Sequence, residues 1–490
     1  MSFKKIKLPP PTSNISDNNT SSIASFKRSY FEIKKRNFIS AILLGFFGIS
    51  GVVAVSFATF SGLPAFHFDF SLPFPSKNEL FKTIDGMEQD KVNILITGIG
   101  GGDHDGANLT DTILFASLHP EGKTLSLLSI PRDLYVDYPL GGRGKINEIY
   151  MRGIQAKESP TQAMEDLGTK LREITGERMD HYISIDFDGF VKFIDLLGGI
   201  EVNVEENLVD TEYPDNNWGY VTFSIKKGYQ TLDGATALKY ARSRHSTSDF
   251  DRSRRQQLVI KAVKEKLFSL DILTSPTKIK SLYYAIISHI KTDLSMGQLA
   301  SLALFGKDIP SENIFAFNLN DSCFQGLAYC QQGGFLYTPM RNLFGGASVL
   351  LPDGATPEHL NAYADTSKFA NIVFNYPEMF LENLEINIFN STKVPGIAGN
   401  VALYLKKFGF TIPDKDSVGT TKDPYDKTQV FATWDEENKI GIPPTSKTLE
   451  ALSLFIFAPQ ETVSANKYSK TPNPKIEVVL GKDYRMVVGE

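Results

Sequence analysis

The chain of 490 residues is 42% hydrophobic and 22% charged, which is ordinary for a globular protein and leaves room for two or three domains. Its formal net charge of −5 at pH 7 argues against a general nucleic-acid-binding protein, because its arginine cluster is local. The two cysteines, Cys323 and Cys330, are too few for a disulfide scaffold or a zinc site. Outside the cytoplasm they would form one disulfide; the alternative is two buried thiols.

The N-terminal part has the pattern of a membrane anchor. Residues 1–37 are predicted to be a cytoplasmic segment, disordered at first and then basic. Residues 38–60 carry no charge and, at about 1.5 Å per residue, suffice for a helix across a hydrocarbon core of about 30 Å. Because the basic residues precede this run, we expect a single-pass cell-membrane protein with its remainder extracytoplasmic. A cleaved signal peptide is the alternative, but no clear Ala-x-Ala site follows. The proline-containing residues 61–90 are predicted to be a linker.

A β-hairpin is predicted after the first strand of the folded region. Residues 92–97 (VNILIT) form a short apolar strand that leads into a glycine-rich loop, GIGGGDHDGANLT. Residues 113–118 and 124–130 form two further strands, joined by a turn centred near Glu121. An antiparallel register about this turn places position 111 opposite about position 131.

This register brings charged residues together at one end of the sheet. Asp111 lies beside Arg132 and Asp133 in the predicted hairpin, next to the glycine loop. Small-ligand sites are expected at such a position in an open α/β sheet. The structural alternative is that Asp111 caps the loop and pairs with Arg132.

Strands and helices alternate in the following region and predict an α/β fold. After a loop with Lys145 and Asn147, the expected elements are a helix over 161–174, a strand over 181–186, a helix over 187–197 and a strand over 200–204. Phe190 and Phe193 belong to the core or line an apolar tunnel.

An arginine cluster over residues 239–257 connects two predicted helices. Its members are Arg242, Arg244, Arg252, Arg254 and Arg255, and Asp249 and Asp251 lie among them. On the second helix, which begins near 251, Arg252, Arg255 and Gln256 share one face by their i, i+3, i+4 spacing. Guanidinium groups fit phosphate oxygens two at a time, so this face suits a pyrophosphate or phosphodiester. The alternative is a solvated basic turn paired with its own aspartates.

The C-terminal part contains a second, smaller α/β unit. Helical segments are expected to continue to about Gly306, an irregular region to follow over 323–351, and a helix to return over 358–374. The last unit then has strands over 385–389, 429–433 and 476–480, with helices over 397–408 and 446–455.

Several of these segments resemble the LytR-CpsA-Psr family. The resemblance rests on LTDTILFASLHPEGKTLSLLSIPRDLYV, KINEIY, FDGFVKFIDLLGGIEVNV and LDGATALKYARSRHSTSDFDRSRRQQ, in this order. The segment INIFNSTKVPGIAGNVALYLKKFGF resembles the accessory domain often appended to this family. The resemblance implies a central mixed β-sheet flanked by helices. It also implies transfer of a glycopolymer from a polyprenyl-pyrophosphate carrier to peptidoglycan, with the diphosphate bound by arginines and Mg²⁺ and the lipid in an apolar tunnel.

The resemblance also implies roles for individual residues. Asp111 corresponds to a magnesium ligand, Lys145 and Asn147 fall in the loop that lines the site, and the diphosphate contacts correspond to Arg132, Arg242, Arg244, Arg252 and Gln256. Arg255 is added as a substrate-binding residue by its shared helix face, and Asp133 is the candidate proton acceptor for the acceptor hydroxyl. The family's second metal-binding aspartate is replaced here by Gly100, so Asp103 and Asp105 are the candidates for the missing carboxylate.

The expected domains are a catalytic domain over 91–345 with its core at 92–267, a connector over 346–382 and the accessory domain over 383–487. Two alternatives to a transferase stay open: a polyprenyl-pyrophosphate hydrolase, and a non-catalytic lipid- or glycan-binding envelope protein. A transcription regulator is disfavoured because the chain is acidic overall and shows no DNA-reading helix.

Overall fold

The computed structural model describes residues 91–102, 106–214, 219–243, 249–269, 287–295, 298, 302, 305–306, 309–319, 334–414, 417–421, 424–432, 434–435, 440–456 and 475–484. Several predictions fall outside these residues: the anchor and linker over 1–90, the carboxylates Asp103 and Asp105, Arg244, and the two cysteines. Within the described ranges, no helix is both long enough and apolar enough to cross a membrane. The described chain forms two compact units, which divide between Asn375 and Tyr376.

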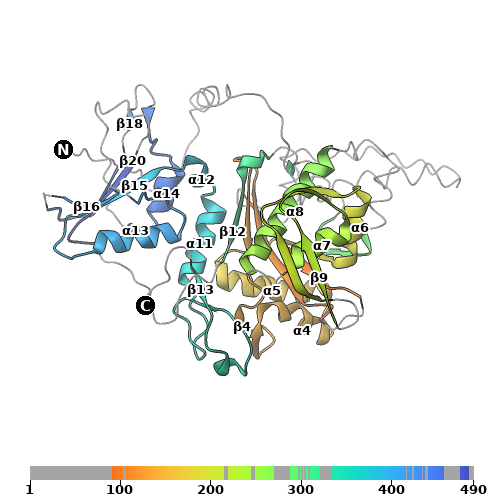
Figure 1. The fold of residues 1–490 in the computed structure, drawn as a ribbon. Coiled ribbons are helices and arrows are strands. Elements are labelled where there is room, and N and C mark those ends of the chain that lie inside the picture. The colour runs from red at the N-terminus through yellow and green to blue at the C-terminus, as the bar shows by residue number, and fades with distance from the viewer. Residues whose placement is uncertain are drawn as a thin grey trace. The chain divides into compact units, whose positions relative to one another are not determined.

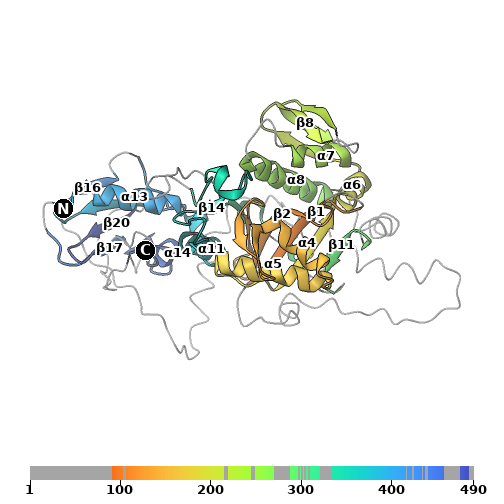
Figure 2. The same ribbon diagram turned by 90° about the horizontal axis from the view of Figure 1, so that it is seen from below.

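The larger unit is built on a mixed sheet, shown in Figures 1 and 2. Its described strands, in spatial order, are β11 (Ile290–Thr292), β6 (His181–Asp186), β1 (Val92–Ile99), β2 (Thr110–His119), β3 (Thr124–Ser129) and β12 (Ile314–Asn318). The pairs β1–β6 and β3–β12 are parallel, and the other three are antiparallel. The central strands are buried almost throughout, as expected for a sheet that is covered on both faces.

Helices cover both faces of this sheet. On one side lie α4 (Ile149–Gln155) and α5 (Pro160–Thr175), and on the other lies α8 (Asp249–Ser269), as Figure 2 shows. Helix α11 (Ala364–Asn375) joins α5, because the Thr366 hydroxyl donates to the Ile174 carbonyl at 2.9 Å. The segment expected to be a connector over 346–382 therefore contributes a helix to the larger unit.

The boundaries of α5 follow from its sequence. The Ser159 side chain accepts a hydrogen bond from the backbone N–H of Gln162 at 3.1 Å and caps the first turn, and Pro160 occupies the first helical position. Gly176 ends the helix with a φ of 75°, a conformation that glycine adopts without strain. The prediction of a helix over 161–174 is correct to within one residue at each end.

A small second layer lies on the outer side of α8. It comprises α6 (Phe187–Leu196), α7 (Gly234–Arg242) and two antiparallel strand pairs, β7 (Ile200–Val204) with β10 (Gly228–Leu232) and β8 (Leu208–Pro214) with β9 (Tyr220–Ile225). Apolar residues from α6, α7, α8 and these strands form one core cluster. Figure 2 shows this order, from the sheet through α8 and α7 to β8.

Some expected elements differ from those observed. Residues 290–292 form the edge strand β11, so the expectation of helix through Gly306 is wrong there. A three-residue strand carries little local signal, and its pairing with β6 determines its conformation. The strand β12 and the hairpin β8–β9 were not predicted, and the helix expected over 358–374 begins at Ala364.

The smaller unit is the expected α/β fold. Its sheet has the order β16 (Val418–Thr420), β15 (Glu385–Asn390), β20 (Lys475–Leu480) and β17 (Gln429–Ala432), and its helices include α13 (Ile397–Lys407) and α14 (Lys447–Leu452). Ser446 caps α14, because its side-chain oxygen accepts from the backbone N–H of Leu449 at 3.4 Å.

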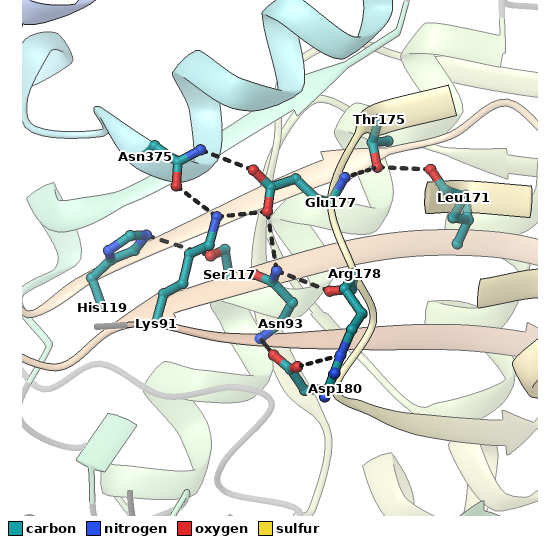
Figure 3. A network of polar contacts seen from close by, with 10 residues as sticks. All are labelled: Lys91, Asn93, Ser117, His119, Leu171, Thr175, Glu177, Arg178, Asp180 and Asn375. Carbon is teal, nitrogen blue, oxygen red and sulfur yellow. Dashed lines mark hydrogen bonds and ion pairs between the residues drawn. The ribbon is translucent and has the colours of Figure 1, made fainter. Parts of the chain in front are cut away.

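A buried polar network fastens the start of β1 (Figure 3). Lys91 is only 7% exposed, and its ammonium lies 2.6 Å from both the Glu177 carboxylate and the Asn375 side-chain oxygen. Asn375 in turn donates to Glu177 at 2.8 Å. A buried charge is tolerated only when it is paired and hydrogen-bonded. The network therefore ties β1, the loop after α5 and the end of α11 into one unit.

Candidate active site

A polar cavity of about 160 Å³ lies where the sheet meets the outer layer. Its lining residues come from the strands β2 and β8, the turn after β3, and the helices α6, α7 and α8: Asp111, Thr112, Arg132, Phe187, Asp210, Tyr213, Pro214, Arg242, Arg252 and Gln256. Five residues singled out from the sequence, Asp111, Arg132, Arg242, Arg252 and Gln256, are thus brought together.

Asp111 and Arg132 form an ion pair at one side of the cavity. The paired residues Leu114 and Ser129 fix the register of β2 and β3, and extending it sets Asp111 opposite Arg132. This is one position from the predicted partner, and a guanidinium N–H of Arg132 donates to the Asp111 carboxylate. The sequence-derived hairpin geometry therefore locates this pair.

Asp133, Lys145 and Asn147 lie behind Arg132 and do not line the cavity. The Lys145 ammonium donates to the Asp133 carboxylate at 2.5 Å, so this acid is engaged in an ion pair. The backbone N–H of Asn147 donates to the Arg132 carbonyl at 3.4 Å. Its side-chain oxygen is buried and accepts no hydrogen bond among the described residues. These residues support the turn that holds Arg132.

Arg242 is held between two aromatic rings. Its guanidinium carbon lies 4.2 Å from the centre of the Phe187 ring and 5.7 Å from that of Tyr213. A guanidinium N–H of Arg242 also donates to the Tyr213 hydroxyl at 3.3 Å. Burial raises the pKa of Tyr213 while the charge of Arg242 lowers it, and the net direction is upward. The phenol therefore stays neutral at neutral pH and orients a permanent cation.

Close packing of two helices positions Arg242. Asp233 caps α7 by accepting from the backbone N–H of Thr236 at 2.8 Å. A Cβ atom at Gly234 would lie 2.2 Å from the carbonyl oxygen of Val191 in α6, so only glycine fits at this contact. Phe187 is the first residue of α6 and is likewise positioned by a helix cap, because the Asp186 carboxylate accepts a hydrogen bond from the backbone N–H of Gly189 at 2.8 Å.

The arginines of α8 face different surroundings. Arg252 is 6% exposed and lines the cavity together with Gln256, whose amide donates to the Thr112 hydroxyl at 3.2 Å. Arg255 does not line the cavity. Its guanidinium donates to the carbonyls of Tyr240, at 3.0 Å, and of Ser243 at the end of α7.

The prediction that Arg255 belongs to the substrate-binding face is thus corrected. The spacing of Arg252 and Gln256 places them one above the other, whereas Arg255 is rotated toward α7 and ties its C-terminus. Arg254, which is not on the predicted shared face, forms a two-pronged ion pair with Glu205 at 2.5 and 2.7 Å.

A second cavity, of about 150 Å³ and almost wholly apolar, adjoins the first. Its apolar lining comes from β1, β2, β6 and the helices α6, α7 and α8: Ile96, Leu114, Ile185, Phe190, Leu238, Ala241, Val259, Ile260 and Val263. Four residues, Thr112, Phe187, Arg242 and Gln256, line both cavities. Of the two phenylalanines considered for a tunnel, Phe190 lines this cavity and Phe193 is fully buried in the core.

The described residues offer a limited set of metal ligands. Nowhere in the described ranges do three His, Cys, Asp or Glu residues gather as a metal site would require. Asp111 nevertheless lines the polar cavity. Because Mg²⁺ keeps several waters and needs only one or two carboxylates beside substrate phosphates, this carboxylate fits a hydrated Mg²⁺.

The position of the missing family aspartate is sterically open. An ideal Cβ at Gly100 would have its nearest neighbour, the Ala107 Cα, at an ordinary 3.5 Å. Gly101, by contrast, has a φ of 71°, and a Cβ there would lie 2.6 Å from the Asp186 Cβ. The loop therefore requires glycine at Gly101, whereas nothing in its packing requires glycine at Gly100.

Five lining residues were not found from the sequence: Thr112, Phe187, Asp210, Tyr213 and Pro214. The sequence signal that could have identified Asp210 is the pattern of β8, in which Leu208, Asp210 and Tyr213 are the buried positions. An aspartate at an inward-facing position of an amphipathic strand marks a polar site, but the strand itself had not been predicted.

Comparisons with known proteins agree with this architecture. The LytR-CpsA-Psr family model matches residues 74–335, and a model described as LytR cell envelope-related transcriptional attenuator matches 383–484. A polyisoprenyl-teichoic acid–peptidoglycan teichoic acid transferase, TagU of Enterococcus faecalis, is 31% identical over 279 residues, or 53% of this chain and 84% of TagU. The cell wall biosynthesis protein LcpA of Corynebacterium glutamicum is 24% identical over 69% of this chain, and the match covers 65% of LcpA, just under two thirds.

A solved structure has also been matched. The crystal structure of Bacillus subtilis TagV aligns with 59% of this chain and 99% of that chain, at 22% identity and a TM-score of 0.42. The family model by itself spans more than half of the present sequence. The chain belongs to the LytR-CpsA-Psr family.

Proposed function

We propose that this protein is a membrane-anchored phosphotransferase that moves a glycopolymer from a polyprenyl-pyrophosphate carrier to a hydroxyl of peptidoglycan. The observation that carries the proposal is the pair of adjoining cavities, one lined by arginines and the other apolar, with four residues in common. A ligand with a doubly charged head and a hydrocarbon tail matches both cavities at once. The TagU relative is named as a transferase of the same kind.

The polar cavity has the charge that such a transfer needs. Arg132, Arg242 and Arg252 carry three permanent positive charges around a space of about 160 Å³. In phosphoryl transfer, the protein acts mainly by positioning the reacting groups and by neutralising charge on the non-bridging oxygens. Because Arg242 is fixed between two rings and Arg132 by its ion pair, little reorganisation is needed when the diphosphate enters.

Mg²⁺ is part of this proposal. Asp111 would hold it, with Asp103 and Asp105 in the glycine-rich loop as the candidates for a further carboxylate. When bound, the ion supplies additional neutralisation of the diphosphate. The ion pair with Arg132 holds the Asp111 carboxylate at the cavity.

The location of the protein follows from its N-terminal sequence. The uncharged run over 38–60, with basic residues only before it, anchors the chain with residues 91–484 outside the membrane. An anchored domain meets a lipid-linked donor at a raised effective concentration. A reporter fused after Glu490 that is active only in the cytoplasm would refute this topology.

An acceptor-dependence assay tests the function. The full chain in lipid vesicles is given a radiolabelled polyprenyl-pyrophosphate glycopolymer and Mg²⁺, with and without peptidoglycan. The proposal predicts label in peptidoglycan and release of polyprenyl monophosphate only when the acceptor is present. Equal release without acceptor would make the protein a hydrolase, and binding without any release would make it a non-catalytic lipid-binding protein.

A further inference from the structure

The strand β8 carries a carboxylate into the arginine-lined cavity from the outer layer. Its side chains alternate, and Leu208, Asp210 and Tyr213 are buried while Val209 and Thr211 are exposed. Leu208 and Tyr213 belong to the apolar cluster of this layer, whereas Asp210, at 1% exposed, lines the polar cavity. Asp210 therefore places a second carboxylate beside the arginines of this cavity.

A β-bulge directs Asp210 and Tyr213 to the same side. Asp210 pairs with Phe223 and Tyr213 with Val221, so three steps along β8 correspond to two along β9. Residues three apart on a regular strand would face opposite sides, and the extra residue removes this difference. Bulges that redirect side chains are frequent beside active sites. The backbone N–H of Glu212, within the bulge, donates to the Asp210 carboxylate at 3.1 Å and orients it.

Asp210 and Asp111 reach the cavity from different layers. Asp111 lies on β2 of the central sheet and is paired with Arg132, whereas Asp210 lies on the hairpin beyond α7 and α8 (Figure 2). Asp133, the proton acceptor expected from the sequence, is bound to Lys145 and lies outside the lining. In the described part of the chain, Asp210 is therefore the second carboxylate that lines this cavity, and it comes from a different layer than Asp111.

We propose that Asp210 is the catalytic base that accepts the proton of the attacking hydroxyl; this inference rests on the proposed transferase function. The acceptor oxygen forms a bond to the phosphorus that carries the glycopolymer, and the bond between that phosphorus and the bridging oxygen breaks. The bridging oxygen leaves with its electron pair as polyprenyl monophosphate, and the hydroxyl proton moves to the Asp210 carboxylate. A positioned aspartate has this role toward the substrate hydroxyl in protein kinases.

Three variants of the full chain test the proposal. Asp210→Asn keeps the shape of the side chain but removes the base, Asp210→Ala leaves room for a small carboxylate, and Glu201→Gln is the control at an exposed position of β7 in the same layer. Each is compared with the unaltered protein for transfer rate, for affinity toward a fluorescent polyprenyl diphosphate, for the Mg²⁺ concentration that gives half-maximal binding, and for thermal unfolding.

General bases contribute about 10²- to 10⁴-fold to rate. We therefore expect Asp210→Asn to lose about 100-fold or more in kcat, with ligand affinity and Mg²⁺ requirement changed by no more than about twofold. Formate should restore part of the activity of Asp210→Ala, which a purely structural role would not allow. Glu201→Gln should transfer at the normal rate.

Two results would overturn the proposal. One is an Asp210→Asn variant that transfers within about threefold of the normal rate. The other is a parallel loss of diphosphate affinity or a many-fold higher Mg²⁺ requirement, which would make Asp210 a binding or metal-ligating residue. Failure of the transferase function itself is recognised separately, because the unaltered protein would then show no acceptor-dependent transfer.

Discussion

Replacing Arg252 by alanine should remove most of the affinity for a polyprenyl diphosphate while the fold survives. Arg252 is 6% exposed in the polar cavity, and a hydrogen bond to a charged group contributes about 1.5–3 kcal/mol. At about 1.4 kcal/mol for each factor of ten, the expected loss is about 10- to 150-fold in Kd. The assay is titration of a fluorescent polyprenyl diphosphate, with circular dichroism to confirm that the variant is folded.

Arg254→Ala is the matched control, since it removes the same charge from the same helix. The side chain of Arg254 is 66% exposed and is paired with Glu205, away from both cavities. An exposed ion pair is worth about 0–1 kcal/mol, and salt screens its charge. We expect an unchanged Kd for the diphosphate. Equal losses for Arg252→Ala and Arg254→Ala would show that the cluster acts only through its overall charge, and would refute the cavity as described.

Five further substitutions have defined outcomes. Arg255→Ala should lower thermal stability and also weaken diphosphate binding, because its contacts with the end of α7 position Arg242; lost binding at unchanged stability would instead indicate direct contact. Val263→Phe should fill part of the apolar cavity and weaken long-chain diphosphates while sparing inorganic pyrophosphate, measured by competition. Gly100→Asp should lower the Mg²⁺ concentration needed for half-maximal binding, since a Cβ fits there. Asp111→Asn should raise that concentration severely. An unchanged Mg²⁺ requirement in both variants would exclude a metal ion at this position. Burial lowers the pKa of Lys264 from 10.5 to about 8. The free energy of unfolding should therefore rise as the pH increases from about 8 to 10.5, because the unfolded chain binds more protons than the folded chain in this range. In Lys264→Met, urea titrations should no longer show this rise.

The hairpin shows what sequence reasoning achieves where local rules apply. A turn centred near Glu121 was enough to predict the neighbours of Asp111, because side chains on paired strands follow from simple register counting. The helix expected over 161–174 was likewise correct to within one residue at each end, because helical periodicity is a local pattern. Local chemistry determines these features, so they are visible without a structure.

Other parts of the site depend on tertiary contacts. Arg255 shares a helical face with Arg252 by spacing, yet its direction is decided by the carbonyls at the end of α7, which no local rule provides. Asp210 and Tyr213 reach one cavity only because β8 contains a bulge relative to β9. Asp133 lies beside Arg132, but it pairs with Lys145 and does not line the cavity, which the hairpin register alone does not reveal.

The central claim is that one ligand occupies both cavities, with its head among the arginines and its tail among apolar side chains. A crystal structure with a short polyprenyl diphosphate and Mg²⁺ tests this most directly. The account predicts phosphate oxygens within hydrogen-bond distance of Arg132, Arg242 and Arg252, and the first isoprene units against Phe190 and Val263. A diphosphate bound elsewhere on the chain, or a tail that leaves the apolar cavity empty, would contradict it.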